Sequence, residues 1–114
     1  MERCLFCQVA CKVLAARIVY EDEQVLAFED INPQAPVHVL VIPNRHIVSL
    51  NDLEAKDVGI ADSLFQAARQ VAELKKIHLS GYRTVINTNS NAGQSVFHLH
   101  LHVLGGRRMG WPPG

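Results

Sequence analysis

Residues 97–104 alternate between apolar side chains and histidine, and this segment constrains the fold more than any other. Successive side chains of a β-strand point to opposite faces, so the alternation predicts a strand with one histidine face and one apolar face. His98, His100 and His102 would then lie in a row, about 6–7 Å apart. The apolar residues between them would enter the core.

Four other segments have the apolar, β-branched character of strands. They are residues 17–20, 25–28, 37–42 and 83–86. The first two flank the polar residues 21–24 and predict an antiparallel hairpin. The third is almost entirely apolar and lies between Pro36 and Pro43, so it predicts a central strand that is covered on both faces.

Between residues 53 and 72 the apolar residues recur at spacings of mostly three or four, which predicts one amphipathic helix. Asn51 or Asp52 would cap its start, and Lys75 suits the negative end of its dipole. The helix follows three predicted strands and precedes two. The sequence therefore predicts an α+β fold, a five-stranded antiparallel meander with one main helix packed on the sheet.

The 11 basic and 11 acidic residues give a formal net charge of zero, but they are divided unevenly along the chain. All Asp and Glu residues lie within residues 1–73, and the remainder carries only basic charges. A chain without net charge lacks the long-range field that attracts nucleic acids and anionic membranes, so we expect neither partner. Residues 84–106 are uncharged, but their Asn, Gln and His side chains argue against a membrane span.

Three cysteines, Cys4, Cys7 and Cys11, lie within the first eleven residues. Their odd number favours reduced thiols or metal ligands over a disulfide framework, which indicates a reducing compartment. The N-terminus also lacks a signal-peptide pattern, because Glu2 lies in the region that should be basic. We therefore expect a cytoplasmic protein with a single domain over residues 1–114.

The histidine row admits three interpretations at this point. The segment could be an edge strand whose outer face happens to carry histidines. The three imidazoles could bind a catalytic metal, because neutral imidazole is a good zinc ligand. Alternatively, one imidazole is a nucleophile or an acid–base group, and its neighbours fix its tautomer and bind an anionic substrate.

The loop before the row, residues 87–95, favours the anion-binding interpretation. It has no carboxylate, it is rich in amide and hydroxyl side chains, and Gly93 permits close approach of the backbone to a ligand. Loops of this kind form nests of N–H groups that cradle phosphate. The sequence therefore predicts a phosphate-binding loop beside the histidine row.

The row resembles the signature of the histidine-triad nucleotide-binding proteins, specifically the Hint branch, in which three histidines alternate with hydrophobic residues. Further matching segments extend over nearly the whole chain. They are residues 28–36, 38–43, 81–83, 93–97 and 104–107, together with His46, Asn87 and the C-terminal Trp-Pro-Pro-Gly. The resemblance implies a homodimer whose sheets join across the two-fold axis. It also implies hydrolysis of purine nucleoside phosphoramidates, such as adenosine 5′-monophosphoramidate, without a catalytic metal.

The same resemblance assigns the catalytic groups. His100 would be the nucleophile that attacks the α-phosphorus and forms a covalent nucleotidyl-histidine. His38, on the neighbouring strand, would orient His100 through a hydrogen bond. His102 and Ser95 would act beside them, and the proton for the departing amine would come from Ser95 or from the imidazole pair.

The nucleotide-binding residues implied by the resemblance form two groups. Asp30 would accept hydrogen bonds from the ribose hydroxyls, and four apolar residues would surround the purine. These apolar residues are Leu5, Phe6, Phe28 and Ile31, and they could equally be ordinary core, Leu5 and Phe28 in particular. The remaining residues assigned to the nucleotide are Asn87, Gly93, Gln94, Ser95, His100, Leu101 and His102.

Cys4 and Cys7 form a single Cys-x-x-Cys pair, which alone is a weak metal signal because zinc needs four ligands. Resemblance to many bacterial Hint-like proteins adds His46 and His98 as the other two. Such a Cys₂His₂ site would be structural, would tie the N-terminus to the sheet and would leave His100 free. The alternative is a pair of buried thiols.

Two other functions compete with the phosphoramidate hydrolase. One is a dinucleoside polyphosphate hydrolase, and the other is a nucleotide-binding or scaffolding protein with vestigial turnover. The expected partners are purine nucleoside monophosphates and phosphoramidates and a second copy of the chain. We expect no cofactor for catalysis.

Overall fold

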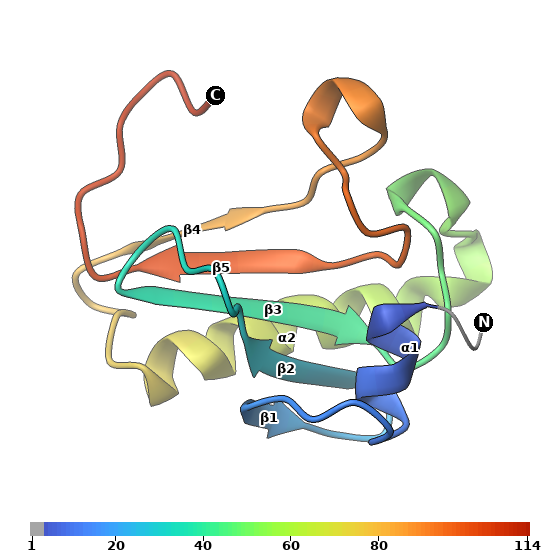
Figure 1. Ribbon diagram of the computed structural model, residues 1–114. Coiled ribbons are helices and arrows are strands. Elements are labelled where there is room, and N and C mark those ends of the chain that lie inside the picture. The colour runs from blue at the N-terminus through green and yellow to red at the C-terminus, as the bar shows by residue number, and fades with distance from the viewer. Residues whose placement is uncertain (1–3) are drawn as a thin grey trace.

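The computed structural model describes residues 4–114 and has five antiparallel strands in one sheet (Figure 1). The strands are β1 (Ile18–Glu21), β2 (Val25–Glu29), β3 (Val37–Pro43), β4 (Tyr82–Val85) and β5 (Leu101–Gly105). Each neighbouring pair is antiparallel. The predicted α+β class, with five antiparallel strands and one main helix, is confirmed.

The last two strands lie in the sheet in the reverse of their order in the chain. β1, β2 and β3 form a meander, but β4 lies at the edge and β5 returns between β3 and β4. Val103 of β5 is opposite Val39 on one side and Thr84 on the other. β5 is therefore an interior strand, which excludes the edge-strand interpretation of the histidine row. The expected dimer would join a second sheet at a free edge, β1 or β4.

The sheet carries an apolar layer on each face, because β3 alternates between two clusters. Val39 and Val41 face the main helix, α2 (Val58–Leu74), and belong to the apolar cluster on that side, the rear cluster. Leu40 and Ile42 face the opposite side and belong to the apolar cluster there, the front cluster. α2 lies behind the sheet, and the short helix α1 (Leu5–Ala10) covers one end of its front face (Figure 1). The prediction of a central strand covered on both faces is confirmed.

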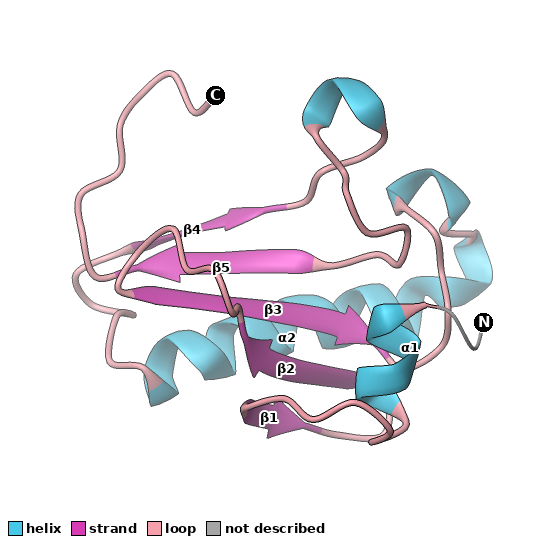
Figure 2. Ribbon diagram, viewed as in Figure 1, coloured by secondary structure: helices cyan, strands magenta, loops and turns pink. Residues whose placement is uncertain are grey.

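The main helix begins at Val58, later than the sequence predicts, and short 3-10 helices precede it (Figure 2). They are η1 (Leu50–Asp52) and η2 (Ala55–Asp57), and a third, η3 (Ser90–Ala92), lies in the loop before β5. Neither Asn51 nor Asp52 therefore caps α2. Leu53 packs on the rear cluster but precedes the helix. Because its spacing fits the helical period, the sequence pattern predicts a helix that begins too early. Within residues 4–114, no helix has both the length and the apolar composition needed to cross a bilayer.

The strand predicted at residues 97–104 begins only at Leu101. The alternation of faces nevertheless extends beyond the strand, since Leu99, Leu101 and Val103 are all buried in the rear cluster. In an extended chain the side chains alternate between two faces whether or not the backbone pairs with another strand. The alternation therefore does not reveal where the strand pairing begins. Residues 97–100 lie outside it.

The sequence pattern does not predict α1. Its start is capped by Cys4, whose Sγ accepts the Cys7 N–H at 3.4 Å. Phe6 and Val9 project from one side of the helix into the front cluster, where Phe6 meets Phe28. A helix of this length gives only one turn of apolar spacing, and it depends on tertiary packing for its stability.

Gly105 at the end of β5 lies against Ile77, so a larger side chain at this position should destabilise the protein. A Cβ at this position would lie 2.6 Å from Ile77 Cδ1 and 3.2 Å from its Cβ. We expect Gly105→Ala to lower the free energy of unfolding by about 1–3 kcal/mol in urea denaturation. Gly110→Ala is the matched control, because a Cβ there meets nothing within 4 Å, and it should change stability by less than about 0.5 kcal/mol. Equal stability of both variants would contradict the close contact.

Candidate functional site

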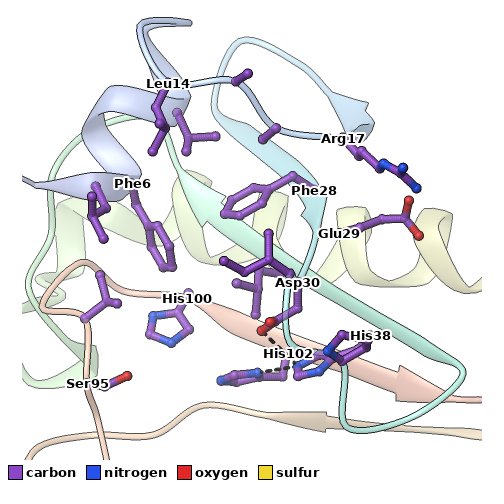
Figure 3. Close-up of a pocket in the computed structure, with 18 of the residues that line it drawn as sticks. Phe6, Leu14, Arg17, Phe28, Glu29, Asp30, His38, Ser95, His100 and His102 are labelled. Atoms are coloured by element: carbon purple, nitrogen blue, oxygen red, sulfur yellow. Dashed lines mark hydrogen bonds and ion pairs between the residues drawn. The ribbon is translucent and has the colours of Figure 1, made fainter.

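A cavity of about 910 Å³ opens on the front face of the sheet, beside α1 (Figure 3). Apolar residues that form one side are Leu5, Phe6, Val9, Phe28 and Leu40. Polar residues on the other side are Asp30, His38, Ser95, His100 and His102. This division suits a ligand with a flat apolar part and a polar or charged part.

His100 is fixed by the backbone of its own segment. Its Nδ1–H donates to the His98 carbonyl oxygen at 2.8 Å, and its ring meets the Phe6 ring edge to face, with 5.1 Å between centroids. In the neutral ring, a proton on Nδ1 leaves Nε2 with a free lone pair. The expectation that His38 orients His100 is wrong, because the hydrogen bond from His100 Nδ1–H to the His98 carbonyl oxygen orients this ring.

A chain of hydrogen bonds instead links His38 to His102. The Gln34 N–H donates to His38 Nδ1 at 3.0 Å, so the proton of His38 lies on Nε2. This Nε2–H donates to His102 Nδ1 at 2.9 Å, which leaves the proton of His102 on its own Nε2. The strand register explains the pairing, since His38 lies opposite Leu104 and hence beside His102. His102 therefore offers a donor where His100 offers a lone pair.

Asp30 approaches the middle of this chain, at His38 (Figure 3). Its Oδ2 is 3.5 Å from His38 Nε2, and its Oδ1 accepts the Asn32 N–H at 2.8 Å. Both contacts hold the carboxylate at the cavity wall, where it is partly exposed and can accept further hydrogen bonds from a ligand.

Burial keeps His38 and His102 neutral on the polar side of the cavity. Desolvation, followed by the nearby His100 and His38, lowers the pKa of His102 to about 4, and Asp30 opposes this only in part. Burial also lowers the pKa of His38 against the opposing charge of Asp30. At neutral pH each of these two rings therefore keeps one N–H and one lone pair, as the hydrogen-bond chain requires.

The loop of residues 87–95 differs from the open nest of N–H groups that the sequence predicts. The Gly93 and Gln94 N–H groups donate to carbonyl oxygens of the same loop, at 3.0 and 3.1 Å. The Gln94 side chain is buried and is also engaged, since Oε1 accepts a backbone N–H at 2.8 Å and Nε2 donates to two carbonyls. A loop must satisfy its own backbone, which directs these donors away from a ligand. Among the predicted loop contacts Ser95 lines the cavity, whereas Asn87, Gly93 and Gln94 do not.

Leu101 also differs from its assignment to the nucleotide, because its side chain is buried in the rear cluster. Ile31 lines the cavity only at its rim and is fully exposed there. Leu5 lines the cavity and is half exposed, whereas Phe28 is both a core residue and a cavity residue. Phe6 packs edge to face on Phe28, with 5.4 Å between ring centroids, so the two form one continuous apolar wall.

The wall extends beyond the residues that the sequence predicts. Additional apolar residues that line the cavity include Val9, Leu14, Ala16, Leu40 and Val96. Two signals could have found some of them. Leu40 lies on the front face of a strand predicted to be covered on both sides, and Val9 lies three residues after Phe6, close to one helical turn.

Four side chains beside the cavity form a candidate metal site. Cys7 Sγ lies 3.2 Å from His46 Nδ1, and the Sγ atoms of Cys4 and Cys7 lie 3.4 and 3.5 Å from His98 Nδ1. These separations match the edge of a zinc tetrahedron, in which sulfur and nitrogen ligands are about 3.5 Å apart. His98 Nε2–H donates to the Pro43 carbonyl oxygen at 2.8 Å, which leaves Nδ1 free to bind a metal. The four residues therefore fit an ion such as zinc.

The protonation of these groups bears on metal binding. Burial, with the neighbouring Cys4, raises the pKa of Cys7 to about 11, so the thiol keeps its proton unless a metal displaces it. Asp30, His38 and His102 also lie close enough together to hold an ion. In that group, however, the facing nitrogens of the two histidines share a proton in their hydrogen bond, which occupies both.

Comparison with known proteins matches the chain over most of its length. A family model of the HIT domain matches residues 12–109, a range that begins after α1. An uncharacterized HIT-like protein of Synechococcus elongatus is 44% identical over 113 residues, 99% of this chain and 98% of that protein. The crystal structure of a HIT family hydrolase from Legionella pneumophila has a TM-score of 0.96 and 46% identity, and the match covers 98% of this chain and 100% of that one. A HIT family hydrolase from Clostridium thermocellum has a TM-score of 0.94 and 46% identity, with 96% of each chain covered.

The buried neutral histidines predict that acid destabilises the protein. His102 has a pKa of about 4 when folded against an ordinary value of 6.5, so the unfolded chain binds more protons between these limits. We expect the free energy of unfolding to be at its full value above about pH 6.5 and to fall towards pH 4, by up to about 1.4 kcal/mol per pH unit for each such histidine. Urea denaturation across this range measures the slope.

Two variants isolate the contribution of His102. His102→Gln removes its titration and should give a shallower slope than the wild type. His78→Gln changes an exposed histidine away from the cavity and should keep the wild-type slope. A His102→Gln protein with an unchanged slope would contradict a buried, neutral His102.

Proposed function

The chain belongs to the HIT domain family, and we propose that it is a purine nucleoside phosphoramidate hydrolase that acts through a covalent nucleotidyl-histidine on His100. Its similarity to HIT family hydrolases supports a hydrolase, and its resemblance to the Hint branch supports phosphorus–nitrogen substrates. The observation that carries the proposal is the bond from His100 Nδ1–H to the His98 carbonyl, because it leaves Nε2 unprotonated on a residue of the cavity wall.

The reaction follows from this arrangement in two displacements. His100 Nε2 attacks the α-phosphorus, the phosphorus–nitrogen bond of the substrate breaks, and the amine leaves with a proton. Water then attacks the same phosphorus, the bond to Nε2 breaks, and the nucleoside monophosphate is released. Two displacements at one centre replace a single difficult attack by water, which lowers the barrier.

Neutral donors meet the charge that develops on the phosphoryl oxygens. The His102 Nε2–H and the Ser95 hydroxyl group are the donors that our proposal assigns to these oxygens. Donors that are already in position cost no reorganisation during the reaction and contribute roughly 3 kcal/mol each in comparable sites. The leaving amine takes its proton from Ser95 or from His102, and the attacking water returns a proton to the same group in the second displacement.

The other end of the cavity suits a nucleoside. Asp30 would accept hydrogen bonds from the ribose hydroxyls, and its contact with the Asn32 N–H supports this role because it fixes the carboxylate. Phe6 and Phe28 would contact the purine, with Leu5 and Ile31 at the rim. Purine selectivity would then come from shape and apolar contact.

We also propose that Cys4, Cys7, His46 and His98 hold a zinc ion. The spacing of their sulfur and nitrogen atoms supports four protein ligands, which leaves no open position for a substrate. A bound zinc ion supplies folding energy in such a site. His100 is not among the four ligands and remains available for the reaction.

Replacement of His100 tests the mechanism. His100→Gly should lower the rate of release of adenosine monophosphate (AMP) from adenosine 5′-monophosphoramidate by about three orders of magnitude or more, because no nucleophile remains. AMP binding, measured by calorimetry, should survive. His78→Gly is the control, since this exposed histidine lies away from the cavity and should leave the rate unchanged. Undiminished turnover by His100→Gly would exclude the covalent mechanism.

The same assay separates the alternatives. The wild-type protein is given adenosine 5′-monophosphoramidate and diadenosine polyphosphates side by side. Faster hydrolysis of the diadenosine compounds would favour a dinucleoside polyphosphate hydrolase. Tight AMP binding with negligible hydrolysis of either substrate would favour a nucleotide-binding or scaffolding protein.

Metal analysis tests the zinc site. Protein purified without chelators should contain about one zinc per chain by elemental mass spectrometry. Cys7→Ser should lose the zinc and melt at a lower temperature, because a closed metal site contributes to folding. Cys11→Ser should retain it, since Cys11 is exposed and lies outside the four-residue group. Wild-type protein that takes up no zinc when zinc is supplied would contradict the site.

A further inference from the structure

The segment that carries His100 lies outside the sheet. β5 pairs with β3 from Leu101, opposite Val41, and not before. Ahead of that point, the Leu99 N–H donates to the Ile47 carbonyl oxygen at 2.6 Å. The position of His100 therefore depends on what holds the residues just before it.

His98 holds this segment through its side chain. It is fully buried, its Nε2–H donates to the Pro43 carbonyl oxygen, and its Nδ1 lies 3.4 and 3.5 Å from the sulfurs of Cys4 and Cys7. Its main-chain carbonyl oxygen accepts the hydrogen bond that orients His100. One residue thus faces the thiols with its ring and fixes the nucleophile with its backbone.

α1 makes a second link between the metal ligands and the cavity. Phe6 lies between Cys4 and Cys7 in the sequence, and its ring packs against His98 at 6.0 Å and against His100 at 5.1 Å between centroids. A helix of six residues does not keep its shape alone. Whatever fixes the two cysteines therefore also fixes the apolar wall of the cavity.

We propose that the metal site of Cys4, Cys7, His46 and His98 positions the active site, so that zinc and a purine nucleotide each strengthen the binding of the other. Zinc would join three separate parts of the chain, namely α1, the loop after β3 and the segment before β5. Without metal, the contacts of the Cys4 and Cys7 sulfurs with His46 and His98 are hydrogen bonds to sulfur, and these are weak. The proposal rests on the proposed nucleotide site and adds a coupling that a purely structural zinc ion would not have.

The test compares zinc-loaded wild-type protein with metal-free protein prepared by a chelator under reducing conditions. We expect the metal-free form to bind AMP at least about fivefold more weakly in calorimetry, at the lower end of usual coupling factors. Because coupling is reciprocal, saturating AMP should raise the zinc affinity, measured against a chromophoric chelator, by the same factor. Equal AMP affinities of the two forms would overturn the proposal.

Comparison of adenosine with AMP separates the two links between the metal site and the cavity, one through Phe6 and one through His98. A loss of adenosine affinity on zinc removal reports the wall at Phe6, and an additional loss for AMP reports the position of His100. The imidazole N–H signal of His100 in ¹⁵N-resolved NMR should broaden or disappear with zinc removal, because its acceptor on His98 is no longer fixed. Circular dichroism follows the fold in parallel. A metal-free chain that has unfolded would overturn the proposal, since zinc would then act on the whole fold.

Cys11→Ser is the matched control for Cys7→Ser. Cys11 follows the same helix, is exposed, and its Sγ donates to the Gln8 carbonyl oxygen, so its replacement should preserve zinc and both nucleotide affinities. Cys7→Ser should reproduce the metal-free protein. A chain that binds AMP but takes up no zinc would overturn this proposal and the zinc site, and would leave the proposed hydrolase in place. A zinc-loaded chain that binds neither AMP nor adenosine would instead contradict the proposed function.

Discussion

The partner of Nδ1 decides what each histidine of the site can do. In His100 this nitrogen donates to a main-chain carbonyl, so the opposite nitrogen has a lone pair. In His102 the same nitrogen accepts from His38, which in turn accepts from the Gln34 N–H, so the opposite nitrogen has a proton. Two neighbouring imidazoles thereby acquire complementary roles from backbone groups that cannot titrate. The rest of the front face serves to hold these partners in place.

The proposed phosphate site differs from one built on cations. Arg83 and Arg107 donate to carbonyl oxygens of their own chain, and Arg17 lies at the far end of the cavity from the histidines (Figure 3). Hydrogen bonds from neutral groups are weaker than charge-assisted ones, so a bare phosphate has little to gain here. In the proposed function, affinity would come largely from the apolar wall and the contact of Asp30 with the ribose. The arrangement would then favour a nucleoside attached to a single phosphoryl group over a small polyanion.

The sequence predicts the sheet, the helix and the face on which the histidines lie, because alternation and helical spacing are set by burial. It does not predict where pairing ends, and Leu101 begins β5 later than the alternation suggests. The family resemblance assigns Gln94 to a ligand, although this side chain closes its own loop. It also assigns His38 to His100, whereas the strand register places His38 beside His102. A resemblance transfers the residue types of a site, but hydrogen-bond partners depend on the geometry of this chain.

α1 lies before the range matched by the family model, and this position has a consequence for how the molecule can vary. The sheet carries two of the cavity histidines, His38 and His102, while one contiguous stretch at the N-terminus carries part of the apolar wall and two residues of the candidate metal site. In the proposed function, contacts with the base and binding of the metal would thus be carried together on one short piece of chain. Exchange of that piece between relatives would change both properties at once and leave the histidines of the sheet on an unchanged scaffold.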